Sequence, residues 1–199
     1  MTEFKPWYVL NVDISNAIRP DFDFGKLLEQ KKLQGTAPGY MWEYHQDNIN
    51  QLYSSEWLDY MNSINLPVNN TLIFWRKPNY QHPTMHIDSP HKKTGKLGLS
   101  LNWCIGPDTG EMIWYEIPDK PGRFTQTETG SLNHDWPVED GVEITRRCIG
   151  STPTIVRIDL PHNVIMKDCP RLLISCRIKN FQPTTWEESV NQLQYLIIE

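Results

Sequence analysis

The sequence predicts a mainly β protein with flanking helices, in which antiparallel strands form a sandwich or barrel. After Pro67 the chain holds several short runs rich in β-branched and aromatic residues, separated by Gly, Pro, Asn and Asp. These runs are TLIFWR, KLGLSLNWCI, GEMIWYEI, TIVRIDL and RLLISCRI. Eight tryptophans and eight tyrosines also favour a β-rich interior. Helical periodicity is found before and after this region.

The N-terminal part predicts one strand followed by helices. The stretch WYVLNVDI, residues 7–14, alternates and carries strand-forming residues, so it is expected to be a strand. From Tyr40 to Ile64, large apolar residues recur at spacings of mostly three, four and seven, which predicts one or two helices packed on the sheet. Those residues are Trp42, Ile49, Leu52, Tyr53, Trp57 and Met61.

The C-terminal stretch PTTWEESVNQLQYLIIE predicts a helix with its own start signal. Thr184 or Thr185 can cap this helix, because Glu187 or Glu188 follows three residues later, as a capping box requires. Helical spacing then predicts a buried stripe made of Trp186, Val190, Leu193 and Ile197.

The 199 residues are expected to form a single domain. We assign 1–66 to an N-terminal strand and supporting helices, 67–180 to the barrel and 181–199 to the C-terminal helix. A long polar stretch at 119–151 is expected to be an inserted loop within the barrel. Such long connections are uncommon unless they have a function, so a decorated loop with one added hairpin and a substrate lid are both open.

The composition argues against several classes of protein. A net charge of -5 and a pI near 5.7 disfavour a protein that binds nucleic acid through its phosphates. Four cysteines without a C-x-x-C pair disfavour a zinc ribbon or disulfide scaffold and favour reduced thiols. There is no run of ~20 apolar residues and no signal-peptide pattern. We expect a soluble, cytoplasmic protein with neither nucleic acid nor membrane as a partner; the oligomeric state stays open.

Two H-x-D triplets are candidate metal-binding motifs, His86–Asp88 in the segment HPTMHIDSPH and His45–Asp47. In a strand, side chains two positions apart lie on the same face, whereas in a helix they diverge by about 200°. The second triplet falls in the predicted helix. The sequence therefore predicts that His86 and Asp88 converge on one ion and that the other pair does not.

Two prolines flank the first triplet and restrict the backbone of this segment. Pro83 and Pro90 keep this segment extended, which makes His82 and His86 a poor helical zinc pair. His82 and His91 are accordingly expected to be loop histidines.

Two ligands do not hold a redox-active iron, and the best candidate for a third is His162. This histidine ends an apolar row that shares one face of the predicted strand, consisting of Val156, Ile158 and Leu160. Nine residues later Arg171 begins the run RLLISCRI. With a turn at KDCP, the two strands are expected to form a hairpin, with a common face made of Arg171, Leu173, Ser175 and Arg177.

If that face is inward, it carries a guanidinium into the interior. A buried arginine without an anion is costly, so Arg171 predicts a carboxylate partner, and its planar fork suits bidentate binding. A dicarboxylate that also chelates the metal would satisfy both groups.

In order and spacing these residues resemble the Fe(II)/2-oxoglutarate-dependent oxygenases, especially their prolyl-hydroxylase-like branch. The resemblance rests on the H-x-D triplet, then His162, Arg171 nine positions later and Ser175 four beyond it. It covers roughly residues 70–180, where HIDSP followed by LSLNWCIG, and LPHNV before PRLLIS, look like the second and last strands of that family's barrel. It implies a double-stranded β-helix, a jelly-roll of the cupin-like kind.

The resemblance implies a role for each site residue. His86, Asp88 and His162 would bind Fe(II) as a facial triad, and Arg171 would bind the distal carboxylate of 2-oxoglutarate. Asn102 falls where the family often has a tyrosine or another hydrogen-bonding residue facing the cosubstrate, so the resemblance implies that it binds the cosubstrate. The implied reaction is hydroxylation of a peptide side chain or small metabolite with O2, releasing succinate and CO2.

Three alternatives remain from the sequence. Arg177 fits the R-x5-R spacing of the nucleic-acid demethylase branch, but the acidic composition favours a salt-bridged barrel residue. A cupin-like barrel would use the same ligands for another metal or for none, and it would not need Arg171, because it binds no 2-oxoglutarate. A non-catalytic binding or structural protein would bind no iron.

Overall fold

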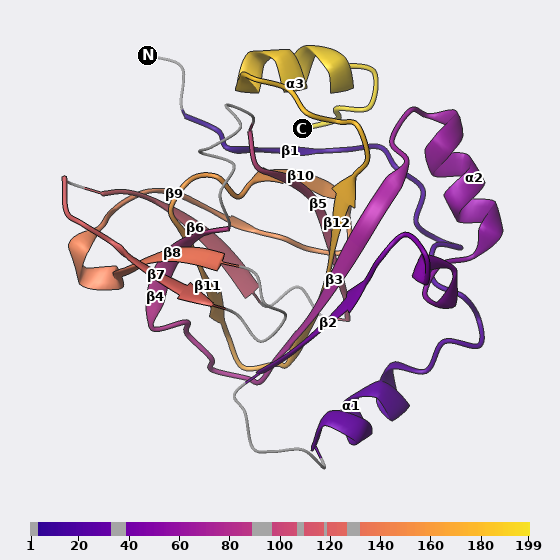
Figure 1. The fold of residues 1–199 in the computed structure, drawn as a ribbon, viewed down its shortest axis with the longest axis horizontal. Helices are drawn as coiled ribbons and strands as arrows, with labels where there is room; N and C mark the ends of the chain where they lie inside the picture. Colours follow the sequence, from indigo (N-terminus) through magenta and orange to yellow (C-terminus); the bar gives the residue numbers. More distant parts are fainter. Residues whose placement is uncertain (1–3, 33–38, 89–96, 107–109, 118, 127–131) are drawn as a thin grey trace.

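Two antiparallel sheets face one another in the computed structural model, which describes residues 4–32, 39–88, 97–106, 110–117, 119–126 and 132–199 (Figure 1). The first sheet, here the major sheet, has the order β1 (Trp7–Val9), β10 (Thr154–Arg157), β5 (Leu99–Ile105), β12 (Arg171–Ile178), β3 (Val68–Arg76), β2 (Gly39–Tyr44). The second, the minor sheet, has the order β7 (Arg123–Gln126), β8 (Leu132–Pro137), β4 (Thr84–Asp88), β11 (His162–Met166), β6 (Gly110–Glu116), β9 (Val142–Cys148). His91 and Pro90 lie outside the described residues.

The strand order is that of a jelly-roll barrel. From β3 onward the chain passes back and forth between the sheets, so that β3, β5, β10 and β12 lie in the major sheet and β4, β6, β9 and β11 in the minor one. Neighbouring strands within a sheet are therefore mostly distant in sequence. The predicted fold, a mainly β jelly-roll with flanking helices, is confirmed.

The first part of the chain differs from the prediction. The expected strand over 7–14 is shorter, since β1 ends at Val9. The predicted helix over 40–64 begins with a strand, β2, followed by the short 3-10 helix Ile49–Gln51 and α2 (Ser55–Ser63). Aromatic residues alternate along β2, which pairs with β3, and this period of two dominates there. A further helix, α1 (Phe24–Lys32), was not predicted.

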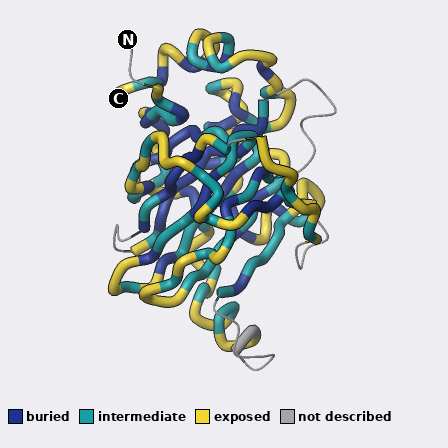
Figure 2. Tube along the Cα trace, turned by 90° about the vertical axis from the view of Figure 1, so that its left-hand side faces the viewer, coloured by how far each residue is buried: buried dark blue, intermediate teal, exposed yellow. Residues whose placement is uncertain are grey.

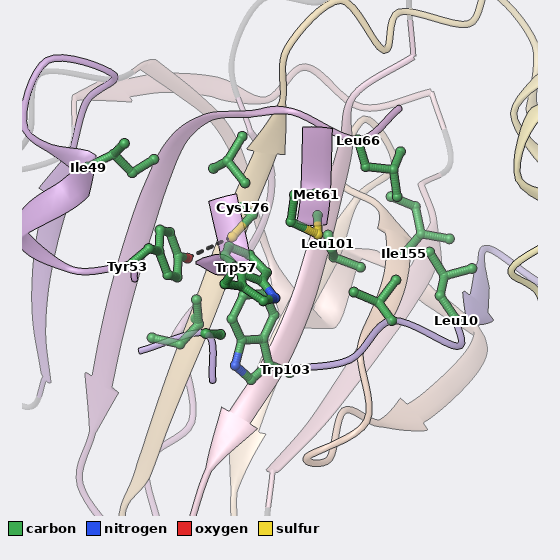
Figure 3. Close-up of a cluster of buried hydrophobic side chains, with 14 of the residues drawn as sticks. Leu10, Ile49, Tyr53, Trp57, Met61, Leu66, Leu101, Trp103, Ile155 and Cys176 are labelled. Carbon is green, nitrogen blue, oxygen red and sulfur yellow. Dashed lines mark hydrogen bonds between the residues drawn. The ribbon is translucent and has the colours of Figure 1, made fainter. Parts of the chain in front are cut away.

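A hydrophobic core lies between the outer face of the major sheet and the helices (Figure 3). Trp57 and Met61 of α2 pack there with Leu101 and Trp103 of β5. Because side chains alternate along β5, Ser100, Asn102 and Cys104 take the other face, toward the inside of the barrel. The buried segments gather in the middle of the molecule (Figure 2). This packing holds the major sheet in place, while its inner face carries a polar row on β5 beside apolar residues such as Val156 and Leu173.

A buried polar cluster connects Tyr53, which lies just before α2, to strands β3 and β12 in the same core. The hydroxyl of Tyr53 lies 2.8 Å from the Cys176 sulfur and 3.0 Å from the Thr71 hydroxyl. Burial raises the pKa of Cys176 to about 11, so this side chain is a neutral thiol at physiological pH.

The C-terminal helix α3 (Trp186–Leu193) is capped as predicted. The Thr185 hydroxyl accepts a hydrogen bond from the Glu188 backbone N–H, and the Glu188 carboxylate accepts from the Thr184 N–H. Of the predicted stripe, Trp186, Leu193 and Ile197 pack on the core cluster, whereas Val190 is only half-buried.

Thr185→Ala is expected to lower the free energy of unfolding by about 1 kcal/mol, because the cap bond to the Glu188 N–H is lost. Urea denaturation measures this. Thr184→Ala is the matched control, because it removes only a hydroxyl bond to the exposed Glu188 carboxylate and should cost less. Equal losses in both variants would contradict the assignment of Thr185 as the cap.

The stretch 119–151 is more regular than predicted. It contains the hairpin β7–β8, which extends the minor sheet beyond β4, and then β9, which is one of the barrel strands. The prediction of an inserted loop is therefore wrong for 142–148, which form a strand. This strand was not predicted because most of its side chains are polar or charged. The insertion itself is the hairpin; its role as a lid stays a prediction. Within the described residues, no helix has the length and apolar character needed to span a membrane.

Candidate metal centre

Strand β4 directs the H-x-D triplet into the barrel. Its alternate residues Met85 and Ile87 pack in a separate hydrophobic cluster with Trp136, on the outer face of the minor sheet. His86 and Asp88 therefore point to the inner face, as the sequence predicted for an extended segment. The neighbouring strand β11 begins with His162, which pairs directly with His86.

The three side chains converge. The Asp88 Oδ1 atom lies 3.3 Å from His86 Nε2 and 4.0 Å from His162 Nε2, and the two imidazole rings are 4.5 Å apart between centroids. All three potential ligand atoms lie within 4.8 Å of one another, a grouping that is unique in the described part of the chain. Facial ligands of an octahedral ion are about 3 Å apart, so the three side chains would move closer together on binding a metal.

The second triplet does not form such a group, but for another reason than predicted. His45 follows strand β2 and Asp47 lies in a turn, so neither is helical. The His45 side chain is largely exposed and lies 3.8 Å from the Glu43 carboxylate. This pair is not part of a group of three potential ligands among the described residues, and the helical explanation for excluding it is wrong.

His162 is held in one tautomer. Its Nδ1 lies 2.9 Å from the Leu160 carbonyl oxygen. Because a carbonyl oxygen only accepts, Nδ1 carries the proton and donates it, and Nε2 presents a lone pair. Burial, with the nearby His86, lowers the pKa of His162 to about 4. At neutral pH this ring is therefore an uncharged ligand whose lone pair lies near Asp88.

Asp88 is held from the opposite sheet. Arg177 on β12 donates from Nη2 to Asp88 Oδ2 at 3.1 Å, which leaves Oδ1 toward the histidines. Burial alone raises the pKa of Asp88, but the hydrogen bond with His86 and the positive charges around it outweigh burial, and the pKa lies below its ordinary value. The predicted salt-bridged role of Arg177 is thus confirmed, with the candidate metal ligand Asp88 as its partner.

The chemistry of this donor set fits a divalent cation. The Asp88 carboxylate and the His162 lone pair are both electron-rich and lie close together in a buried site. A cation between them would turn this unfavourable contact into coordination, and the orientation of His162 by Leu160 is typical of metal-ligating histidines.

Arg171 lies buried on the same inner face of β12. Its Nε donates to the Cys104 sulfur at 2.8 Å and its Nη2 to the Ile149 carbonyl at 3.2 Å. Among the described residues no carboxylate lies within salt-bridge distance of it. A Cβ on Gly110 would stand 2.7 Å from Arg171 Cδ, so the absence of a side chain at 110 makes room for the arginine.

The expected hairpin between β11 and β12 is wrong, although the common inward face is right. β12 pairs with β3 and β5 in the major sheet, while β11 pairs with β4 and β6 in the minor sheet. The chain crosses the barrel between them. Arg177 and Arg171 therefore approach the interior from the wall opposite His86 and His162.

Asn102 lies in a buried polar row on the inner face of β5. The Ser100 hydroxyl donates to Asn102 Oδ1 at 2.7 Å and lies 2.6 Å from the Ser175 hydroxyl. Because its carbonyl oxygen already accepts, Asn102 can offer its amide nitrogen to a ligand.

Two neighbours of His86 were missed from the sequence. The loop histidine His82 packs with its ring 5.1 Å from that of His86, and burial lowers the pKa of His82. Asp135 on β8 is the direct strand partner of His86. The alternation in LNHDWP places Asn133 and Asp135 on one face, but only the β4–β8 pairing indicates what that face contacts.

Comparisons with known proteins give structural similarity only. No known family model matches the chain, and no curated protein sequence does. A Pseudomonas putida prolyl-4-hydroxylase aligns with 87% of this chain and 92% of its own, at a TM-score of 0.45 and 10% identity.

Two further solved structures align less closely. A Bacillus subtilis oxalate decarboxylase variant aligns with 84% of this chain (TM-score 0.37, 10% identity). The vicilin of hazelnut, Corylus avellana, aligns with 73% (TM-score 0.35, 11% identity). The chain spans about a third of the length of these two, 33% and 31% respectively. The jelly-roll assignment itself comes from the strand order of this chain.

Proposed function

We propose that the protein is an Fe(II)- and 2-oxoglutarate-dependent dioxygenase that hydroxylates a C–H bond of a peptide side chain or a small metabolite. The observation that carries this proposal is a pairing of two features inside one barrel. His86, Asp88 and His162 offer three ligand atoms within 4.8 Å of one another. The buried Arg171, on the opposing sheet, has no carboxylate partner among the described residues.

The triad would hold Fe(II) on one face and leave three coordination positions for cosubstrate and oxygen. His162 serves as a neutral ligand because the Leu160 carbonyl holds the Nδ1 proton. Arg177 engages Asp88 Oδ2, which favours coordination through Oδ1 alone. When bound together, Fe(II) and 2-oxoglutarate supply the oxidising power for hydroxylation, with succinate and CO2 as coproducts.

Arg171 would bind the distal carboxylate of 2-oxoglutarate. Its buried position strengthens a charge-assisted, bidentate pair and gives a strong preference for a dicarboxylate of the right length. Asn102 would donate its amide N–H to the same molecule. Apolar residues that also line the interior would limit access of water, among them Met112, Trp114, Val156 and Leu173.

A cupin-like metal-binding barrel without 2-oxoglutarate is the second candidate. The contacts that Arg171 makes with Cys104 and the Ile149 carbonyl favour it, because they give this arginine a structural role. In that case the metal site is kept and the cosubstrate is not bound. Arg171 therefore separates the two candidates.

Anaerobic addition of Fe(II) and 2-oxoglutarate is expected to produce the weak visible charge-transfer band of the iron chelate. Asp88→Ala and His162→Ala should lose this band and the formation of succinate under air, because each removes a ligand. Asp47→Ala is the matched control, since it alters the other H-x-D triplet and should retain both signals.

Each negative result would favour a different candidate function. Absence of both the band and succinate with the wild-type protein would contradict the oxygenase. Iron binding without any effect of 2-oxoglutarate would favour the metal-binding barrel, and no iron binding would favour a non-catalytic protein. Once the band is seen, uncoupled 2-oxoglutarate turnover can be screened against peptides and small metabolites to find the substrate class.

A further inference from the structure

Three acidic or imidazole side chains lie in one line across the inner face of the minor sheet. His86 on β4 pairs directly with His162 on β11 at one side and with Asp135 on β8 at the other. Directly paired residues project from the same face of a sheet, with their Cβ atoms about 5 Å apart. Asp135 therefore flanks His86 on the side away from His162, and the inserted hairpin β7–β8 is what brings it there.

His86 and Asp135 each have a buried atom without a hydrogen-bond partner in the described structure. These atoms are His86 Nδ1 and Asp135 Oδ1. The other oxygen, Asp135 Oδ2, accepts from the Thr125 hydroxyl at 2.6 Å, and the residue is only 7% exposed. The second candidate histidine ligand, His162, has no unpaired ring nitrogen of this kind, because its Nδ1 donates a hydrogen bond to the Leu160 carbonyl. An unpaired buried polar atom is costly and calls for an explanation.

The tautomer of His86 explains why these two atoms do not pair with each other. His86 Nε2 lies 3.3 Å from Asp88 Oδ1, so in the neutral ring the proton belongs on Nε2. Nδ1 is then an acceptor and cannot bond to another acceptor, Asp135 Oδ1. A metal on Nε2 displaces that proton, and the neutral ring carries it on Nδ1 instead. Nδ1 thereby becomes the donor that Asp135 lacks.

We propose that Asp135 is a positioning residue of the metal centre, whose carboxylate accepts a hydrogen bond from His86 Nδ1–H when a divalent cation is bound. The proposal rests on the metal site of the proposed function. Metal-ligating histidines almost always donate their second N–H to such a partner, which orients the ring and increases its basicity. His162 uses a carbonyl for this purpose, and His86 would use a carboxylate supplied by the hairpin.

Other groups near Asp135 are weaker candidates for its free oxygen. Arg123 is its strand partner on β7 but is exposed, and no ion pair joins the two in the described structure. The His82 ring also packs beside His86, where burial lowers the His82 pKa and the Asp135 charge acts to raise it. No hydrogen bond or ion pair joins His82 and Asp135 in the described structure, however, and His82 Nδ1 lies 2.8 Å from the Thr84 carbonyl. A role of Asp135 toward either group would not depend on metal.

The test is proton NMR of the full-length protein loaded with Co(II), in which the N–H protons of coordinated histidines give shifted, solvent-exchangeable signals. The wild type is expected to show two slowly exchanging signals, one for His86 and one for His162. In Asp135→Ala one signal should exchange rapidly and disappear, while the other, held by Leu160, remains. Titration should show Co(II) affinity weakened by about 10–100-fold.

Asp140→Ala is the control, because this carboxylate lies just beyond β8 and pairs with Lys120 instead. It should keep both signals and full affinity. Asp135→Asn is isosteric and keeps a weaker acceptor, so its affinity should lie between those of the wild type and Asp135→Ala. If Asp135→Ala does not fold, the Asn variant decides: wild-type affinity together with unaltered exchange would overturn the proposal.

The outcomes separate this inference from the proposed function. If the wild type binds no divalent metal, the proposed function fails together with this inference. If the wild type binds metal but Asp135→Ala keeps both slow signals and full affinity, only the role of Asp135 is refuted. Loss of both signals would also count against it, because a general disturbance of the site does not distinguish His86 from His162.

Discussion

Arg171→Met is expected to weaken the binding of 2-oxoglutarate about 30-fold or more and to leave the protein at least as stable as the wild type. In the metal-binding barrel without cosubstrate, an arginine at this position has only a structural role. In the proposed oxygenase, Arg171 is a buried cation whose carboxylate partner is the cosubstrate. Without 2-oxoglutarate, this unpaired charge lowers the stability of the protein. A buried charge without a counter-ion is costly, so its replacement by an apolar side chain of similar size should not lower stability.

The contacts of Arg171 support this expectation for stability. The Ile149 carbonyl, which accepts from Arg171 Nη2, also accepts from the Cys104 thiol at 2.9 Å, so it keeps a partner in the variant. For the ligand, removing one partner of a buried charge pair costs about 2–5 kcal/mol, which corresponds to an affinity weakened about 30-fold or more. Binding is measured by titrating the charge-transfer band with 2-oxoglutarate at saturating Fe(II).

Arg157→Met is the matched control for Arg171→Met. Arg157 is another arginine with little exposure, but it has its own carboxylate, donating to both oxygens of Asp159 at 3.1 and 2.8 Å. Its loss should lower stability and leave 2-oxoglutarate affinity unchanged. Gly110→Ala provides a second approach, because the added methyl group would press on Arg171 as well as on the flexible end of Met166, without removing the arginine. Strong destabilisation by Arg171→Met with unaltered cosubstrate affinity would favour the metal-binding barrel.

The sequence predicts the barrel well because strand periodicity, turn residues and aromatic content all indicate the same fold class. The prediction from sequence fails where helical and strand periodicity both fit the same residues. Between 40 and 64 the spacing of apolar residues suggested helix, whereas the alternation of Tyr40, Trp42 and Tyr44 belongs to β2. It also fails at β9, whose side chains are largely exposed and whose apolar alternation is limited to Val142 and Ile144 before two arginines.

The candidate site is partly predictable for a similar reason. The convergence of His86 and Asp88 follows from local geometry, since both lie on one face of one strand. The contacts made by Arg177 and Asp135 depend on which strands are paired and on the closure of the barrel, which a single sequence does not specify. Arg171 and His162 were placed on neighbouring strands of a hairpin, yet they lie on opposite walls. Their inward direction was nevertheless correct, because alternation within each strand determines it.

The metal-free protein is expected to lose about 3 kcal/mol of stability through His162 as the pH falls from 6.5 to about 4. The native pKa of His162 is about 4, while its ordinary value is 6.5. Between these values the unfolded chain binds a proton that the native protein does not, so acid favours unfolding. The contribution of His162 is fully present above pH 6.5 and is lost progressively toward pH 4.

Asp88 affects stability at a lower pH than His162 does. Its native pKa is below the ordinary 3.8, so it is ionised in both states through most of that window, and its contribution is lost only at lower pH. His82 has a lowered pKa too and adds to the acid sensitivity with the same sign. Comparison of variants, rather than the wild-type curve alone, therefore isolates His162.

The measurement is urea denaturation in the presence of a chelator at several pH values between 7 and 4. His162→Gln removes the titrating group, so its free energy of unfolding should fall less steeply with acid than that of the wild type. His45→Gln, at an exposed histidine, should retain the wild-type slope. The comparison depends on slopes, so a constant loss of stability in His162→Gln does not affect it. Parallel curves for the wild type and His162→Gln would mean that His162 is not held neutral, and its Nε2 would then not offer a lone pair to a cation.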